Sequence, residues 1–230
     1  MTKALISTAL ALSLALAPGF AAAKDKSKKK GQEIAAPARI YAPVNYNVNE
    51  DLDNILLLDL STGERVAIRL MPDWAPHHVE RIKELARQGF YNGVIFHRVI
   101  DGFMAQTGDP TGTGRGGSQL PDIQAEFNDL PHVRGSVSMA RAASDDSANS
   151  QFFIVFYPRF ALDRRYTNFG RVIANMDAVD RVQRGEPPQN PTKIVQASIA
   201  SDRKAPPAFV PPAPDAQPIT AEMLKSSQVQ

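Results

Sequence analysis

The sequence lacks cysteine altogether, and aromatic residues fill only 7% of its 230 positions. Without cysteine there is no disulfide framework, no thiolate metal site and no thiol nucleophile. Neither sign of charge dominates, because 26 lysines and arginines stand against 24 aspartates and glutamates and leave a net charge of +2. So small an excess does not hold a polyanionic backbone, and we therefore expect no nucleic-acid partner.

Motifs of several enzyme classes are missing as well, namely H-E-x-x-H, G-x-S-x-G and a run of alternating acids for calcium. His77 and His78 are neighbours on a predicted helix, so they point apart, cannot share a metal and are expected at the surface. Residues 112–117 match G-x-G-x-x-G, but Asp-Pro-Thr directly precedes them and Ser-Gln-Leu-Pro directly follows, so neither an adjoining strand nor a helix N-terminus is predicted there. We interpret this segment as an ordered glycine loop, and we expect no metal and no cofactor.

The two ends of the chain differ from its middle. Lys3, a small and apolar run from Ala4 to Ala17 and an alanine triplet at 21–23 form the pattern of a secretory signal peptide over residues 1–23. That run is shorter than the roughly 20 residues that span a bilayer, so we expect cleavage, export and no stable membrane insertion afterwards. Residues 24–46 are predicted to be a charged flexible linker, and residues 203–230 a Pro-rich disordered tail.

Residues 47–202 remain as one folded unit. A helix is predicted to open near Asp73 and Pro76 and to end at Gly89, and a second one covers 177–184 with Asp177 as its cap. Residues 65–70 alternate apolar and polar side chains, which predicts one solvent-facing side. The predicted strands are 55–60, 65–70, 94–99, 103–107, 135–139, 152–156, 169–173 and 194–199. This pattern predicts an all-β fold, an eight-stranded antiparallel closed barrel with two capping helices.

Three segments carry the chemistry: 96–114, which begins Phe-His-Arg-Val; 138–154, which holds Ser-Met-Ala-Arg and Ser-Gln-Phe-Phe-Ile; and 162–170, which begins Leu-Asp. In this order and spacing they resemble the cyclophilin family of peptidyl-prolyl isomerases, especially its exported bacterial members, from about Asn54 to Ile199. The resemblance implies a periplasmic isomerase that acts on X–Pro bonds of folding proteins. It also implies proline-containing polypeptide clients, and we expect a monomer.

The resemblance assigns catalysis to Arg98, which would stabilise the twisted amide nitrogen, with Gln106 orienting the guanidinium or the substrate carbonyl. It implies an apolar proline pocket of Phe103, Met104, Phe153 and Leu162, with Tyr166 as an aromatic wall. His97 would flank the site. Gln151 and the backbone at Ala140 and Arg141 would hold the peptide in an extended conformation. Ala161 stands where animal cyclophilins have tryptophan, which argues against strong cyclosporin binding.

Two other readings stay open. A cyclophilin-fold chaperone or binding module would hold Pro-containing segments in the same groove with little catalysis. The second of them is a scaffold that acts through the Lys-rich linker and the Pro-rich tail. Retention of Arg98 favours the enzyme, because a pure binder has no need of a cation beside the bond that rotates.

Overall fold

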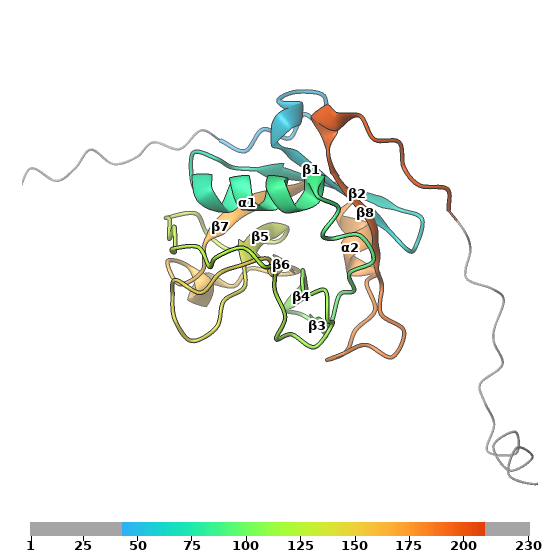
Figure 1. Ribbon diagram of the computed structural model, residues 1–230. Helices are drawn as coiled ribbons and strands as arrows, with labels where there is room; N and C mark the ends of the chain where they lie inside the picture. Colours follow the sequence, from blue (N-terminus) through green and yellow to red (C-terminus); the bar gives the residue numbers. More distant parts are fainter. Residues whose placement is uncertain (1–42, 210–230) are drawn as a thin grey trace, which may run out of the picture. The chain divides into compact units, whose positions relative to one another are not determined.

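One antiparallel sheet organises residues 43–209, which are the residues that the computed structural model describes (Figure 1). The predicted signal peptide, most of the predicted linker and most of the predicted tail lie outside this range. The sheet order is β3-β4-β6-β5-β7-β2-β1-β8. The strands are β1 Ile55–Leu60, β2 Arg65–Leu70, β3 Arg98–Ile100, β4 Met104–Thr107, β5 Ser136–Met139, β6 Phe152–Val155, β7 Asn168–Ala174 and β8 Ile194–Ile199. The prediction of eight antiparallel strands is thereby confirmed.

The predicted closure of the barrel is wrong. The end strands β3 and β8 are not paired with each other, so the sheet forms an open half-barrel. An irregular segment before β3 contacts the start of β8 instead. It does so through a bridge between Ile95 and Lys193 and through backbone hydrogen bonds of Gly93 and Val94 with Ile194 and of Phe96 with Thr192. Gly93 precedes this segment with φ of 83°, and only Arg98 and Val99 of the expected strand 94–99 are part of a strand, β3.

The first helix, α1 Pro76–Arg87, lies across one side of the sheet in Figure 1 and buries Val79, Ile82 and Leu85. Proline at its first position and Gly89 with φ of 73° just after it mark its two ends, as the sequence predicted. The second helix, α2 Met176–Asp180, is shorter than predicted. Its N-cap is Asn175 and not Asp177. Three short 3-10 turns complete the fold: η1 Leu52–Asn54, η2 Phe160–Leu162 and η3 Ala200–Asp202.

His78 is a correction to the expected pair of surface histidines. His77 is exposed, but His78 is fully buried and its Nδ1 lies 2.6 Å from Oε2 of Glu126. The same carboxylate accepts hydrogen bonds from the backbone N–H groups of His77 and His78, which at a helix N-terminus have no partner within the helix. Burial lowers the pKa of His78, against the opposing effect of Glu126. A loop residue 48 positions away therefore caps α1.

Arg69 corrects the predicted solvent-facing side of β2. Its side chain is only 2% exposed, and Ala67 beside it is also buried. The guanidinium donates to the backbone carbonyls of Asn45, Asn47, Glu50 and Asp51 at 2.7–3.0 Å. Residues 45–51, which we call the N-terminal arm, thus pack on the sheet through one arginine, and the contacts of the folded unit begin before residue 47.

The buried interior is built from the apolar side chains of the strands and α1. Phe152 lies between Tyr91 and Phe169, with ring centroids 5.6 and 6.2 Å apart in edge-to-face geometry. The Tyr91 hydroxyl donates to the carbonyl of Ser150 at 3.1 Å, so even this buried polar atom is satisfied. The interior therefore fixes β6 against β7, and β6 carries part of the site described below.

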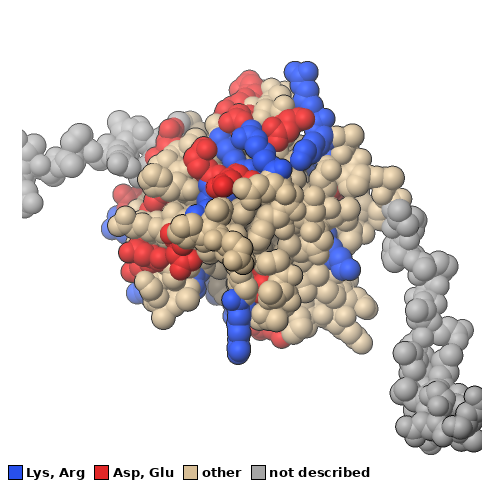
Figure 2. Space-filling model, viewed as in Figure 1, with Lys and Arg blue, Asp and Glu red and all other residues tan. Residues whose placement is uncertain are grey.

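Figure 2 shows the surface in the same view as Figure 1. Lysines, arginines, aspartates and glutamates intermix over its upper part, where no single sign dominates. Ion pairs between Lys83 and Asp53 and between Arg87 and Asp202 belong to the α1, η1 and η3 elements. On this face the near-zero net charge is therefore also locally balanced.

We predict that Arg69→Met releases the N-terminal arm. Four carbonyls lose their donor, and because the arm can then lift into water, the free energy of unfolding should fall by about 1–3 kcal/mol. Urea denaturation measures the loss, and amide exchange locates it at residues 45–51. Arg65→Met is the matched control, since Arg65 lies on the same strand but pairs with Asp59. Unchanged exchange in the arm of Arg69→Met would contradict the assignment.

Candidate active site

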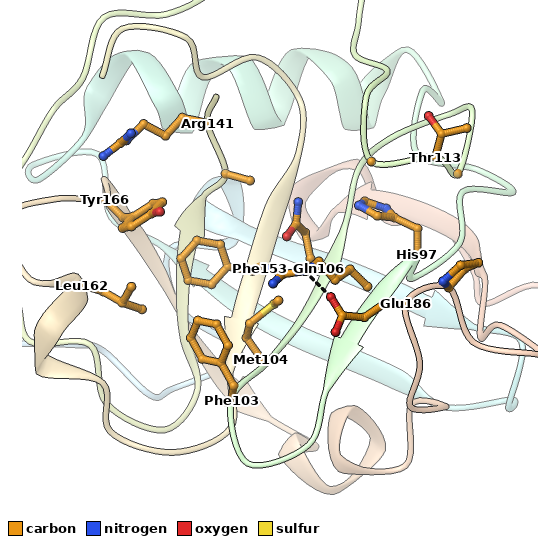
Figure 3. Close-up of a pocket in the computed structure, with 15 residues that line it drawn as sticks. His97, Phe103, Met104, Gln106, Thr113, Arg141, Phe153, Leu162, Tyr166 and Glu186 are labelled. Atoms are coloured by element: carbon orange, nitrogen blue, oxygen red, sulfur yellow. Dashed lines mark hydrogen bonds and ion pairs between the residues drawn. The ribbon is translucent and has the colours of Figure 1, made fainter. Parts of the chain in front are cut away.

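A groove of about 810 Å³ opens beside β3, β4 and β6 (Figure 3). It continues into a second cavity of about 540 Å³, and the two share Gln106, Gly114, Ala140 and Arg141. Every predicted site residue lines one or the other. The first cavity is lined by His97, Arg98, Phe103, Met104, Gln106, Ala140, Arg141, Phe153, Leu162 and Tyr166, and the second by Gln151 among others.

Strand register places the central side chains in one row. Arg98 on β3 lies opposite Gln106 on β4, and Gln106 lies opposite Phe153 on β6. Residues directly opposite each other in an antiparallel pair project from the same face of the sheet. A cation, an amide and an aromatic ring are therefore side by side, although they are far apart in the sequence.

The apolar part of the groove lies on the Phe153 side. Met104 and Phe153 are buried, while Phe103 and Leu162 are half-buried and open to the cavity. Tyr166 packs edge-on against Phe153 with centroids 5.6 Å apart. Figure 3 shows these side chains gathered on one side of Gln106. Such a pocket suits a pyrrolidine ring, which has no N–H to satisfy.

Arg98 has one ionic partner, which the sequence did not predict. Its Nε donates to Oε2 of Glu186 at 2.7 Å. Within residues 43–209 its two terminal nitrogens make no hydrogen bond, and the side chain is 42% exposed. Glu186 and Pro187 also line the groove. The sequence did not point to these two residues, because they follow α2 and lie outside the three segments that carry the motifs.

A pair of glutamines connects the groove to the glycine loop. Gln106 Nε2 donates to Oε1 of Gln151 at 2.9 Å, and Gln151 Nε2 donates to the carbonyls of Gly114 and Gly116. The amide nitrogen of Gln106 thus points toward Gln151, which leaves its oxygen to accept a hydrogen bond from another neighbour. Ala140 donates its N–H to the Gln151 carbonyl at 2.9 Å. At Ala140, one of the two backbone positions expected to hold the peptide, the N–H is therefore engaged and the carbonyl stays available.

Arg141 and His97 support the walls. The Arg141 guanidinium lies 4.9 Å from the Tyr166 ring centroid, donates to the Arg165 carbonyl and pairs with Asp145 at 3.1 Å. His97 is buried on the other side, and burial lowers the pKa of its imidazole.

The glycine loop is ordered by Asp109, which sequence reasoning missed. Its buried carboxylate accepts the N–H groups of Thr111, Gly114 and Gly116 at 2.6–3.1 Å. A Cβ at Gly116 would lie 2.1 Å from Oδ1 of Asp109, so only glycine allows this approach. No helix lies within residues 108–135, so the segment lacks the helix N-terminus that a dinucleotide-binding motif needs.

A buried network resembles a hydrolase triad in connectivity. Ser138 Oγ lies 2.9 Å from Nε2 of His132, whose Nδ1 lies 2.8 Å from Oδ1 of Asp163. Ser138 is fully buried, so no substrate reaches it, and burial lowers the pKa of His132. Ser138 lies opposite Phe153, and Asp163 follows Leu162, so the network ties together two walls of the apolar pocket. Within residues 43–209 no group of acids and histidines is placed to hold a metal, and no helix could cross a membrane.

We predict that Asp109→Ala loosens the glycine loop in a pH-dependent way. Burial alone would raise the pKa of the Asp109 carboxyl, but hydrogen bonds from Thr111, Gly116 and Gly114 lower it to about 2 from the ordinary 3.8. A lowered pKa adds stability above pH 3.8 that disappears as the pH falls toward 2. The mutant should be about 2 kcal/mol less stable at pH 7. Denaturation from pH 7 to pH 2 should show this difference shrinking, and a constant difference would refute the argument.

Comparisons with known proteins agree with this geometry. Residues 57–199 match the family model described as cyclophilin type peptidyl-prolyl cis-trans isomerase/CLD. A probable peptidyl-prolyl cis-trans isomerase of Brucella suis is 48% identical over 170 residues, which cover 67% of this chain and 86% of that protein.

Solved structures give the same result. The crystal structure of the cyclophilin AquaCyp293 from Hirschia baltica superposes with a TM-score of 0.61 at 31% identity, over 68% of this chain and 77% of that one. A cyclophilin-type isomerase of Cryptosporidium parvum, crystallised in the presence of the dipeptide Ala-Pro, gives 0.59 at 28% identity over 63% and 98%. With its groove, its strand register and these relatives, the chain belongs to the cyclophilin-type peptidyl-prolyl cis-trans isomerases.

Proposed function

We propose that this isomerase rotates X–Pro bonds without a covalent intermediate, with Arg98 as its catalytic residue. The uncatalysed barrier is about 18–20 kcal/mol, because rotation breaks the resonance of the amide. As the bond twists, the prolyl nitrogen gains a basic lone pair. A cation that donates a hydrogen bond to this nitrogen stabilises the twisted state more than the planar one.

The position of Arg98 is the observation that carries the proposal. The guanidinium is anchored through Nε and lies in one row with Gln106 and Phe153, and its terminal nitrogens make no hydrogen bond within the described residues 43–209. Arginine keeps its charge at any physiological pH and presents a planar fork of donors. Proline bound against Phe153 would therefore have its nitrogen within reach of a fixed cation.

The other residues would bind and orient the peptide. Phe103, Met104, Phe153 and Leu162 would surround the proline ring, with Tyr166 as the outer wall. The Gln106 oxygen would accept from Arg98 and hold its plane. Gln151 and the backbone at Ala140 and Arg141 would keep the preceding residues extended along the second cavity. His97 would pack behind the glycine loop, next to Gly114.

We predict that Arg98→Ala lowers kcat/KM for cis/trans exchange of an Ala-Pro tetrapeptide by about 100-fold. Arg98→Lys should lose most of the rate as well, because an ammonium is a point charge without the planar fork. Exchange NMR measures the rate, and titration measures peptide affinity. Arg87→Ala is the matched control, since Arg87 has a similarly exposed, ion-paired side chain on α1. Peptide binding without rate enhancement in the wild type would favour the binding-module reading.

Export is the second part of the proposal. The pattern over residues 1–23 supports cleavage after Ala23, and the fold needs neither disulfide nor thiol in an oxidising compartment, since the sequence has no cysteine. The clients would then be proline-containing polypeptides that fold in the periplasm.

We predict that the mature protein begins at Lys24. Expression of the full chain in a Gram-negative host, followed by periplasmic extraction and N-terminal sequencing, measures both the compartment and the cleavage site. Replacement of Leu12 and Leu14 by arginine should retain the uncleaved chain in the cytoplasm, because charges interrupt the apolar segment. An intact N-terminus in the soluble cytoplasmic fraction of the wild type would disprove export.

A further inference from the structure

Glu186 is an acidic residue that lines the groove and pairs with Arg98, and no sequence motif pointed to it. It lies in the connection between α2 and β8, which contacts β3, and Figure 3 shows its carboxylate at the rim opposite the apolar side chains. Its Oε2 accepts from Nε of Arg98 at 2.7 Å, and its own side chain is 52% exposed. The contact joins residues 88 positions apart.

The backbone next to Glu186 is fixed against β3. The Gly185 N–H donates to the Val99 carbonyl at 2.9 Å, and the Val99 N–H donates to the Gly185 carbonyl at 2.8 Å. Gly185 has φ of 142°, and a Cβ there would lie 2.5 Å from Cα of Pro188. Val99 directly follows Arg98, so the two partners of the ion pair are attached to one rigid two-stranded bridge.

Arg184 secures the other side of this connection. Its guanidinium lies 4.4 Å from the Phe156 ring centroid and donates to the Val182 carbonyl at 2.6 Å. Phe156 is fully buried and follows β6. The segment that carries Glu186 is therefore held by a backbone bridge on one side and by a cation–π contact on the other.

This placement affects the freedom of Arg98. An arginine on a three-residue edge strand has about 2 kcal/mol of rotamer entropy to lose before its fork can be aimed. A carboxylate at Nε fixes the plane of the guanidinium and leaves both terminal nitrogens for a ligand. The negative charge also offsets part of the positive charge, so a purely electrostatic role would make Glu186 unfavourable for catalysis and only a geometric role makes it useful.

We propose that Glu186 is a positioning residue of this isomerase, which holds the Arg98 guanidinium through Nε so that its terminal nitrogens face the bound prolyl bond. This inference rests on the proposed role of Arg98. It assigns a role in catalysis to the connection after α2. Gly185 and Arg184 would contribute by holding this connection in place.

The test compares Glu186→Ala with Glu186→Gln in exchange of the Ala-Pro tetrapeptide. Alanine removes the acceptor and should lower kcat/KM by about two- to fivefold, the size expected of a partly exposed ion pair. Glutamine removes the charge but keeps an oxygen for Nε, and it should retain at least about half of the rate. Peptide affinity should change little in either variant. Asp53→Asn is the matched control, because Asp53 is 56% exposed and pairs with Arg87 at 2.7 Å.

A spectroscopic readout separates positioning from general stability. The Nε–Hε signal of Arg98, assigned by its loss in Arg98→Lys, should shift and broaden in Glu186→Ala and stay near its wild-type position in Glu186→Gln. An unchanged rate in Glu186→Ala would overturn the proposal, as would an equal loss in both variants with the Arg98 signal in place. If Arg98→Ala keeps full activity while Glu186→Ala still moves the signal, the contact is real and the proposed mechanism has failed.

Discussion

The register of β3, β4 and β6 is the constraint on which the site depends. Antiparallel pairing puts Arg98, Gln106 and Phe153 in one row on one face. Because side chains alternate between the two faces of a strand, a slip of one residue would turn the guanidinium away from the pocket. The buried packing of Phe152, next to Phe153 and on the opposite face, prevents such a slip in β6.

Much of the groove is made of irregular chain, and single buried side chains keep it ordered. Asp109 satisfies several N–H groups of the glycine loop, Glu126 caps α1, and Arg69 satisfies carbonyls of the N-terminal arm. In each case one charged group replaces the partners that a strand or helix would give the backbone. The open half-barrel therefore presents loops at its rim that are fixed in place.

The proposed rotation of an X–Pro bond depends on a cation and an apolar pocket, which Arg98 and the side chains around Phe153 would supply. The network of Ser138, His132 and Asp163 illustrates the distinction between geometry and function. Its distances are those of a catalytic triad, but the serine is fully buried. Access to substrate, and not hydrogen bonding alone, separates a supporting network from an active site.

The sequence by itself determined the number of strands and the limits of α1, because these follow from local periodicity and turn residues, and its resemblance to the cyclophilin family implied the residues that would meet in the groove. Only the tertiary structure decided that the sheet stays open, that His78 and Arg69 are buried, and that Glu186 reaches Arg98. Those outcomes depend on contacts between distant segments, and a charged residue shows no pattern in sequence that tells whether a partner will cover it.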